Sequence, residues 1–348
     1  MRRFSRVVKI GKRKIGGTEK VAIQSMLNVP SYDVKKHVEE AARLAGAGCE
    51  ILRIAIPDMD AVRLIPAIKE QVDIPLVADI HFDYRLAIES VAAGIDKIRI
   101  NPGNIGDDAR VKLVADACMS RSIPIRIGVN SGSVEKNILE KYGHPTAEAL
   151  CESAMYHVSL LEKFDFEDIV LSLKSSEVKT MVDAYRLIVK KCNYPLHLGV
   201  TETGTKKMGI VKSAAGIGAL LLDGIGDTIR VSLTADPVEE INAAKDILKA
   251  VGLEKTGVEI ISCPTCGRTR IDIIKLVDEC ERRLAACPKN IKVAIMGCAV
   301  NGPGEAREAD IGVAGGDGVG LIFKKGEIVR KVKEENIVDE LVREIETL

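Results

Sequence analysis

One stretch decides the fold of this chain: Leu76-Val-Ala-Asp-Ile-His-Phe-Asp-Tyr-Arg-Leu-Ala-Ile-Glu-Ser-Val-Ala-Ala-Gly-Ile-Asp-Lys-Ile-Arg-Ile-Asn101. A short apolar run, Leu76 to Asp79, precedes an amphipathic stretch, Tyr84 to Ala93, and a second short run, Lys97 to Ile100. This order of patterns predicts a strand, a helix and a second strand. Such a βαβ unit places its two strands parallel in one sheet.

The same alternation continues on both sides of this unit, from the N-terminus to about residue 250. Eight runs are expected to be strands: Val21 to Ser25, Ile51 to Ile54, Leu76 to Asp79, Lys97 to Ile100, Ile125 to Val129, Ile169 to Ser172, Leu196 to Val200 and Thr228 to Val231. The helical patterns between them include Val34 to Ala45, Met59 to Val72, Tyr84 to Ala93, Ala109 to Ser120 and Ala147 to Lys163.

Eight strand–helix repeats over this length are typical of a (β/α)8 TIM barrel, whose usual length is about 250 residues. A doubly wound open sheet is the competing architecture. The barrel is favoured because the repeats continue to eight and no glycine-rich dinucleotide turn follows the first strand. Residues 1–20 are expected to form a short hairpin that caps the barrel floor.

A smaller module follows the barrel. After a helix from Val238 to Ala250 comes a turn-rich stretch, Val251 to Gly257, and we place the domain boundary there. The expected domains are residues 1–252, a substrate-binding TIM barrel, and residues 257–348, a small α+β domain. The latter is predicted to hold strands at Val258 to Ser262, Lys292 to Met296 and Ile311 to Ala314, a strand pair across Gly318 to Arg330, and helices at Ile271 to Ala286 and Ile337 to Glu346.

The composition restricts the class of partner and compartment. Lysine and arginine total 50, as do aspartate and glutamate, so no net charge attracts nucleic acid or an anionic membrane. The N-terminus lacks a signal-peptide pattern, and no apolar run is long enough to cross a membrane, so we expect a cytoplasmic protein. The nine cysteines are then expected to be reduced, and clustered ones indicate a metal site.

Polar residues follow the predicted strands, at the end of the barrel where chemistry gathers. Basic side chains come from five strands, and their mutual repulsion calls for an anion such as a phosphate or diphosphate, which guanidinium groups bind in a bidentate way. The expected binding residues are Arg53, His81, Arg99, Asn101, Arg126, Asn130, Lys174, His197, Arg230 and Ser232.

Three of these polar positions leave alternatives open. His81 and His197 either contact the substrate or are hydrogen-bonded structural residues. Glu202, in Thr201-Glu-Thr-Gly, is a carboxylate on a loop that can approach a ligand closely, and it is the candidate proton donor or acceptor. Its alternative role is as a partner for one of the arginines.

A second group of candidate ligands lies in the C-terminal domain. Cys263-Pro-Thr-Cys266 follows a predicted strand, and Cys298 follows another, inside Met296-Gly-Cys-Ala-Val-Asn-Gly-Pro-Gly-Glu305. A C-x-x-C pair alone is shared by zinc sites, redox dithiols and iron–sulfur sites. A zinc site would need Cys280 or Cys287 as its fourth ligand, and a redox dithiol would leave Cys298 without a role.

Taken together, these blocks resemble the 4-hydroxy-3-methylbut-2-enyl diphosphate synthase family of the methylerythritol phosphate pathway. The resemblance runs from about Val7 to the last helix. It is carried by Val77-Ala-Asp-Ile-His-Phe-Asp-Tyr-Arg, Arg99-Ile-Asn-Pro-Gly-Asn-Ile-Gly, Arg126-Ile-Gly-Val-Asn, Gly226-Asp-Thr-Ile-Arg-Val-Ser-Leu, Ser262-Cys-Pro-Thr-Cys-Gly-Arg-Thr and Gly297-Cys-Ala-Val-Asn-Gly-Pro-Gly-Glu-Ala.

The resemblance implies a four-iron four-sulfur cluster in the second domain. Its ligands would be Cys263, Cys266, Cys298 and Glu305, with Asn301 beside the cluster and the substrate. The implied substrate is 2-C-methyl-D-erythritol 2,4-cyclodiphosphate, which takes up two electrons and loses water to give (E)-4-hydroxy-3-methylbut-2-enyl diphosphate. Glu202 would deliver a proton.

The resemblance also implies partners. Electrons would come from a flavodoxin or a ferredoxin, and the enzyme would work as a head-to-tail homodimer. Two alternatives compete with it: a sugar-phosphate aldolase or isomerase barrel with a structural zinc module, and a metal-ribbon module that binds nucleic acid. The neutral charge and the lack of aromatic residues around the cysteines argue against the latter.

Overall fold

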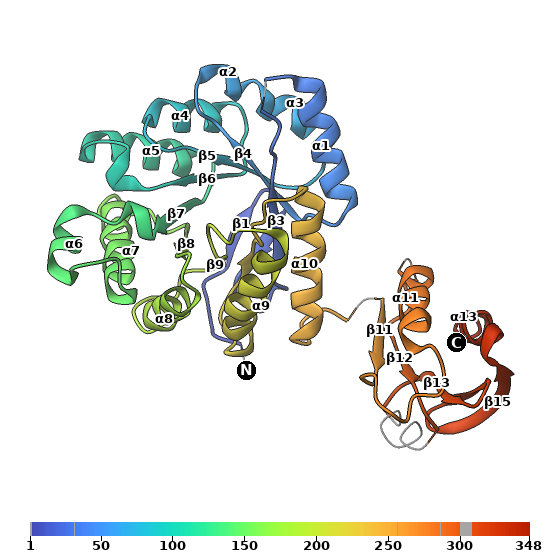
Figure 1. Ribbon diagram of the computed structural model, residues 1–348. Coiled ribbons are helices and arrows are strands. Elements are labelled where there is room, and N and C mark those ends of the chain that lie inside the picture. Colours follow the sequence, from blue (N-terminus) through green and yellow to red (C-terminus); the bar gives the residue numbers. More distant parts are fainter. Residues whose placement is uncertain (1, 31, 256, 286, 300–307) are drawn as a thin grey trace. The chain divides into compact units, whose positions relative to one another are not determined.

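A computed structural model of the chain describes every residue except 1, 31, 256, 286 and 300–307 (Figure 1). The chain divides into two compact units, Met1–Glu254 and Lys255–Leu348. In the described part of the chain, no helix has the length and apolar character that a membrane crossing requires.

The first unit is built on a parallel sheet whose strands are β3 (Ala22–Met26), β4 (Ile51–Ala55), β5 (Leu76–Asp79), β6 (Lys97–Ile100), β7 (Ile125–Asn130), β8 (Ile169–Lys174), β9 (His197–Leu198) and β10 (Thr228–Ile229). Within the described residues the eight strands lie in the order β8-β7-β6-β5-β4-β3-β10-β9. A parallel bridge between Leu171 of β8 and Leu196, just before β9, joins the two ends of the sheet. The predicted TIM barrel is therefore confirmed.

Helices surround these strands (Figure 1). They are α1 (Val34–Gly46), α2 (Met59–Val62), α3 (Leu64–Gln71), α4 (Tyr84–Ala92), α5 (Asp108–Ser120), α6 (Lys136–Tyr142), α7 (Ala147–Glu162), α8 (Val178–Ile188), α9 (Lys206–Leu222) and α10 (Pro237–Ala250), with short 3-10 turns at Pro102–Asn104 and Ser131–Ser133. The single helix expected from Met59 to Val72 is in fact two, α2 and α3. Pro66 explains the break, because it has no N–H to donate and its ring clashes with the carbonyl of Val62.

Successive side chains of each strand point alternately outward and inward. The outward ones, such as Ile98, Ile100, Ile125 and Ile127, are buried in the large apolar core shared with the helices. The alternate residues Lys97, Arg99 and Arg126 consequently face the barrel interior.

The amino-terminal end of the barrel is closed by the hairpin of β1 (Val8–Ile10) and β2 (Arg13–Ile15). Its three apolar side chains form one buried cluster with residues that begin the strands: Val8, Ile10, Ile15, Ala22, Ile51, Val77 and Val170. The expected floor hairpin is confirmed. The functional end is therefore the carboxyl end of the strands.

The second unit contains a mixed sheet of β11 (Val258–Ser262), β12 (Ile291–Met296), β13 (Ile311–Gly316), β14 (Val319–Lys324) and β15 (Glu327–Lys333), in that order. The first three strands are parallel and the last two are antiparallel. Helices α11 (Ile273–Leu284) and α13 (Ile337–Glu346), the latter after a 3-10 turn at Glu334–Asn336, pack on one face of the sheet. Asp317 and Gly318 form the turn between β13 and β14, with Gly318 at φ 67°.

Candidate functional site

Basic side chains from neighbouring strands share the barrel interior. Arg99, Arg126 and Lys174 are buried, whereas the Arg53 and Arg230 side chains keep 11% and 19% of their surface exposed. Burial, followed by the charges of Arg230, Arg126, Arg53 and Arg99, lowers the pKa of the Lys174 ammonium well below its usual value. The five basic residues predicted from separate strands are thus close enough to act on one another.

Asp79 at the end of β5 is the carboxylate that holds two of these arginines. Its Oδ2 accepts a hydrogen bond from Arg53 Nη2 at 2.5 Å, and its Oδ1 accepts one from Arg99 Nη1 at 3.2 Å. Burial alone would raise the pKa of this carboxyl, but the Arg53 charge, the His81 hydrogen bond and the Arg99 charge outweigh it and hold the pKa far below its usual range. Asp79 is therefore ionised and orients both guanidinium groups.

Glu240 on α10 has the same function for Arg230. Its Oε1 accepts from Arg230 Nη2 at 3.2 Å and from the backbone N–H of Leu233 at 3.0 Å, and it is buried. Neither Asp79 nor Glu240 was predicted as a binding residue. The position of Asp79 at the end of a predicted strand was a sequence signal for this role. Glu240 had no such signal, because it reaches the site from the helix α10.

Several buried side-chain nitrogen atoms in this interior have no hydrogen-bond partner among the described residues. They are Arg53 Nε, Lys97 Nζ, Arg126 Nε, Arg126 Nη2 and His197 Nε2. A buried donor without an acceptor is costly, and a buried cation more so. The arrangement therefore suits an anionic ligand that brings several acceptor oxygens.

Two glycines give the basic side chains room. A Cβ on Gly128 would lie 2.4 Å from Arg99 Nε, and a Cβ on Gly199 would lie 3.0 Å from Lys174 Nζ. Any larger residue at these positions would displace the cation from its place in the interior. Sequence patterns did not predict this role, because it depends on which side chain of one strand lies against the glycine of the next.

The two predicted histidines lie in different environments. The His81 side chain is 57% exposed, and its Nε2 lies 3.3 Å from Asp79 Oδ2. His197 is fully buried, and its Nδ1 lies 2.8 Å from Thr228 Oγ1. Burial, together with the charges of Arg126 and Lys174, lowers the pKa of His197 well below its usual value, so its ring is neutral.

The predicted amide and hydroxyl residues lie at the same strand ends. Asn101 Oδ1 accepts from the backbone N–H of Gly128 at 3.0 Å, which fixes the end of β6 against β7. Asn130 caps the turn after β7, where Ser133 Oγ donates to its carbonyl at 3.1 Å. The carbonyl of Ser232 accepts a hydrogen bond from Thr203 Oγ1.

Glu202 lies in a strained loop after β9. Its φ is 51°, in the left-handed region that favours glycine, and its side chain is exposed. The next residue, the buried Thr203, anchors the loop through its bond to Ser232. A non-glycine residue in this conformation persists where the surrounding structure holds it, and such positions are frequent at functional sites.

The candidate metal ligands follow two neighbouring parallel strands of the second unit. Ser262 in β11 pairs with Ile295 in β12, so Cys263 and Cys298 leave the sheet at the same edge. The backbone N–H of Gly297 donates to Cys263 Sγ at 3.2 Å. Hydrogen bonding by the backbone N–H of Arg268 lowers the pKa of the exposed Cys266 thiol, the direction that favours a thiolate ligand.

These three cysteines fit an iron–sulfur group by donor type, and Cys263 and Cys298 also share a sheet edge. Among the residues that the structure describes, no three His, Cys, Asp or Glu side chains lie closely enough together to hold a metal ion. The predicted residues Asn301 and Glu305 lie outside the described residues. Cys280, considered as a zinc ligand, is instead buried in the apolar core under α11, where burial raises the pKa of its thiol to about 11.

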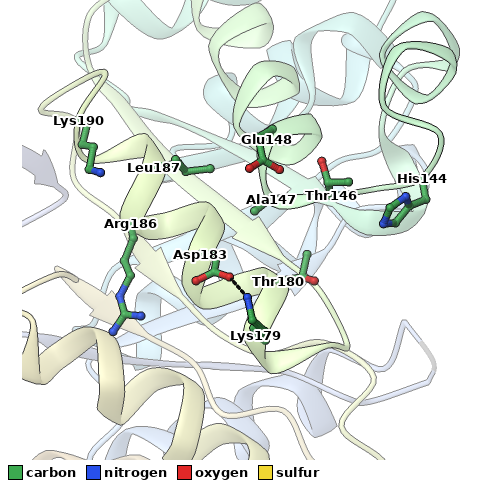
Figure 2. Close-up of a pocket in the computed structure, with 10 residues that line it drawn as sticks. All are labelled: His144, Thr146, Ala147, Glu148, Lys179, Thr180, Asp183, Arg186, Leu187 and Lys190. Atoms are coloured by element: carbon green, nitrogen blue, oxygen red, sulfur yellow. Dashed lines mark hydrogen bonds and ion pairs between the residues drawn. The ribbon is translucent and has the colours of Figure 1, made fainter.

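A separate hollow of ≈ 400 Å³ lies between the start of α7 and the exposed face of α8 (Figure 2). Its charges are mixed: Glu148 and Asp183 lie among Lys179, Arg186 and Lys190, and Lys179 Nζ is 2.5 Å from Asp183 Oδ2. Of the described residues that line it, none belongs to the predicted site. We do not include it in the candidate site.

Comparisons with known proteins identify the family of each unit. Residues 5–245 match the GcpE TIM-barrel domain, and residues 259–347 match the GcpE protein C-terminal domain. The chain is 60% identical over 347 residues to a Clostridium perfringens protein, covering 100% of this chain and 99% of the relative. It is 60% identical to a Fusobacterium nucleatum protein, covering 99% of this chain and 98% of the relative. Both are named 4-hydroxy-3-methylbut-2-en-1-yl diphosphate synthase (flavodoxin).

Solved structures with low sequence similarity share the barrel alone. A Stenotrophomonas maltophilia dihydropteroate synthase superposes with a TM-score of 0.53 at 12% identity, covering 72% of this chain and all of that protein. At this identity the likeness concerns the fold and carries no information on the reaction.

Proposed function

The chain belongs to the GcpE family, and from this premise we propose that it catalyses the reductive opening of 2-C-methyl-D-erythritol 2,4-cyclodiphosphate to (E)-4-hydroxy-3-methylbut-2-enyl diphosphate. Two electrons and one proton enter, the ring C–O bond and a C–OH bond break, a C=C bond forms, and water leaves. The alternative, a sugar-phosphate aldolase or isomerase barrel with a structural zinc module, is not supported by the relatives.

One observation carries the proposal: the barrel interior holds six basic side chains, Lys97 among them, and the described carboxylates that pair with them are Asp79 and Glu240. This excess of buried positive charge matches a ligand with a diphosphate. We assign Arg53, Arg99, Arg126, Lys174 and Arg230 to the phosphate oxygens, since charged donors bind such oxygens strongly. His81, Asn101, Asn130, His197 and Ser232 are assigned to the remaining polar groups of the substrate.

Glu202 is the proposed proton donor to the departing hydroxyl. It has the side-chain type for this role, it lies on a loop anchored by Thr203, and its strained backbone holds it in one conformation. Asp79 and Glu240, the two carboxylates beside the basic group, are engaged by arginines, which makes them less suited to this role.

The proposed cofactor is a four-iron four-sulfur cluster held by Cys263, Cys266, Cys298 and Glu305, with Asn301 beside it. When bound, such a cluster supplies electrons one at a time and a Lewis-acidic iron. The chain's own contribution is a set of backbone donors near the sulfur ligands, of which the Gly297 N–H is one.

The proposed electron donor is a flavodoxin, which the names of the relatives include, with ferredoxin as the alternative. We further propose a head-to-tail homodimer, in which the cluster domain of one subunit serves the barrel of the other. A cytoplasmic location is proposed because free thiolate ligands require a reducing compartment.

The test is an anaerobic assay of the full chain with the cyclic diphosphate and reduced flavodoxin, followed by phosphorus NMR. We expect the ring phosphorus signals to be replaced by those of a linear diphosphate. Unchanged ring signals with an iron-loaded protein would contradict the proposed reaction.

A further inference from the structure

Lys97, the first residue of β6, has no role in the site as described so far. It is 0% exposed, and its Nζ has no hydrogen-bond partner among the residues that the structure describes. Its neighbours along the strand, Ile98 and Ile100, face the helices, so Lys97 shares the inward face with Arg99. A fully buried lysine without an acceptor needs an explanation.

The depth of Lys97 in the barrel follows from the strand register. Val77 pairs with Lys97, and Asp79 pairs with Arg99. Val77 belongs to the apolar cluster above the floor hairpin. Lys97 thus begins about 7 Å below Arg99 along the strand, a distance that the flexible stem of a lysine can span.

The Lys97 side chain lies close enough to the other basic side chains to interact with their charges. After burial, the charges of Arg126 on β7 and Arg53 on β4 are the causes that lower the pKa of Lys97. The Lys97 charge in turn lowers the pKa of His197 on β9. Asp79 on β5 lies nearby by register, but both its oxygens already accept from arginines.

The proposed reaction supplies an acceptor for this ammonium. The cyclic diphosphate carries one ionisable oxygen on each phosphorus. When the ring C–O bond breaks, the electron pair stays on the phosphate oxygen, so the terminal phosphate of the product carries one more negative charge. The group that binds this phosphate should therefore be a cation with a free donor.

We propose that Lys97 is a further substrate-site residue, which binds the terminal phosphate that ring opening releases and so favours the opened diphosphate over the cyclic one. The inference rests on the proposed function. Arg99 and Lys174 are assigned to phosphate oxygens that the substrate already carries. Lys97 is assigned to the negative charge that forms on the phosphate when the ring opens.

The experiment compares Lys97→Met with the wild-type protein, as anaerobic holoenzyme, by calorimetric titration with the cyclic substrate and with the linear product. Met keeps the length of the side chain without its charge. We expect product affinity to fall by at least about ten-fold, as for a lost charge-assisted hydrogen bond, while substrate affinity changes by less than about three-fold. Equal losses for both ligands, or no loss for either, would overturn the inference.

Two further measurements separate this result from other causes. Lys112→Met removes a lysine from the exposed pair with Asp116, 2.6 Å apart, and should leave both affinities unchanged. The ligand-free Lys97→Met protein should melt at the wild-type temperature or above, because it loses a buried amine that has no hydrogen-bond partner among the described residues. A lower melting temperature would mean that Lys97 has a partner without ligand, against the proposal.

The outcome also distinguishes this inference from the proposed function. A wild-type holoenzyme that neither binds nor converts the cyclic diphosphate would overturn both. Conversion by the wild-type protein, with equal effects of Lys97→Met on both ligands, would overturn the role of Lys97 alone.

Discussion

Asp79 on β5 accepts a hydrogen bond from Arg53 on the neighbouring strand β4, at 2.5 Å between Oδ2 and Nη2. The same carboxylate holds Arg99 through its other oxygen. The relationship shows how the barrel keeps repelling cations in place: one ionised carboxylate binds two guanidinium groups and offsets one of their two charges. The positive charge that no carboxylate offsets is available to bind an anionic substrate.

Asp79→Asn should therefore destabilise the protein. Removing one partner of a buried ion pair leaves the arginines unpaired, and the expected loss in unfolding free energy is about 3 kcal/mol. Asp73→Asn is the matched control, because Asp73 pairs with Lys12 on the surface with both side chains more than 80% exposed. Urea unfolding measures the unfolding free energy of both variants. Equal values for Asp79→Asn and Asp73→Asn would contradict the prediction.

The same carboxylate predicts a pH dependence of stability. Its pKa in the folded protein is lowered from an unfolded value of about 3.9. Its contribution is thus complete above that pH and is lost as the pH falls further. The stability gap between wild type and Asp79→Asn should narrow between about pH 5 and pH 3. A gap that is constant over this range would show that the Asp79 charge does not contribute.

Glu240→Gln should lower kcat/KM by at least about ten-fold, because Arg230 loses the charge that orients it. Glu239 precedes it on α10 but makes an exposed pair with Lys206 at 3.1 Å. Glu239→Gln should leave kcat/KM near the wild-type value. Steady-state kinetics of the pair provide the comparison, and similar losses in both would rule out a specific role for Glu240.

Substitution of Glu202 by glycine should have opposite effects on stability and on activity. Glu202→Gly relieves a left-handed residue and should stabilise the fold by about 1 kcal/mol. It should nevertheless reduce turnover by about 10² to 10⁴, as should Glu202→Gln, because the proton donor is gone. Thermal unfolding and single-turnover product formation measure the two effects. Wild-type turnover in Glu202→Gln would exclude it as the proton donor.

Gly128→Ala tests the space reserved for Arg99. The added methyl would meet Arg99 Nε at 2.4 Å, so we expect weaker substrate binding with the cofactor content unchanged. Gly46→Ala is the control, since a Cβ there meets no atom within 4 Å. Substrate titration of the two variants should differ, and identical affinities would contradict the steric account.

Much of this architecture could be predicted from the sequence, because the alternation of strand and helix patterns and the polar residues at strand ends are local features. The barrel, its floor hairpin and the gathering of Arg53, Arg99 and Lys174 were predicted in this way. The contributions of Lys97, Glu240 and Gly128 were not. They depend on register between strands, on a helix that reaches into the site, and on close packing across strands, and none of these leaves a periodic signal.

The most direct test of the account is an iron and sulfide analysis of the anaerobically purified chain, with absorption spectra before and after dithionite. We expect about four irons per chain and a brown chromophore that bleaches on reduction. Cys298→Ala should lose this chromophore, whereas Cys280→Ala, in the apolar core, should keep it. A colourless wild-type protein with one zinc, even after anaerobic reconstitution, would contradict the proposed reductive chemistry.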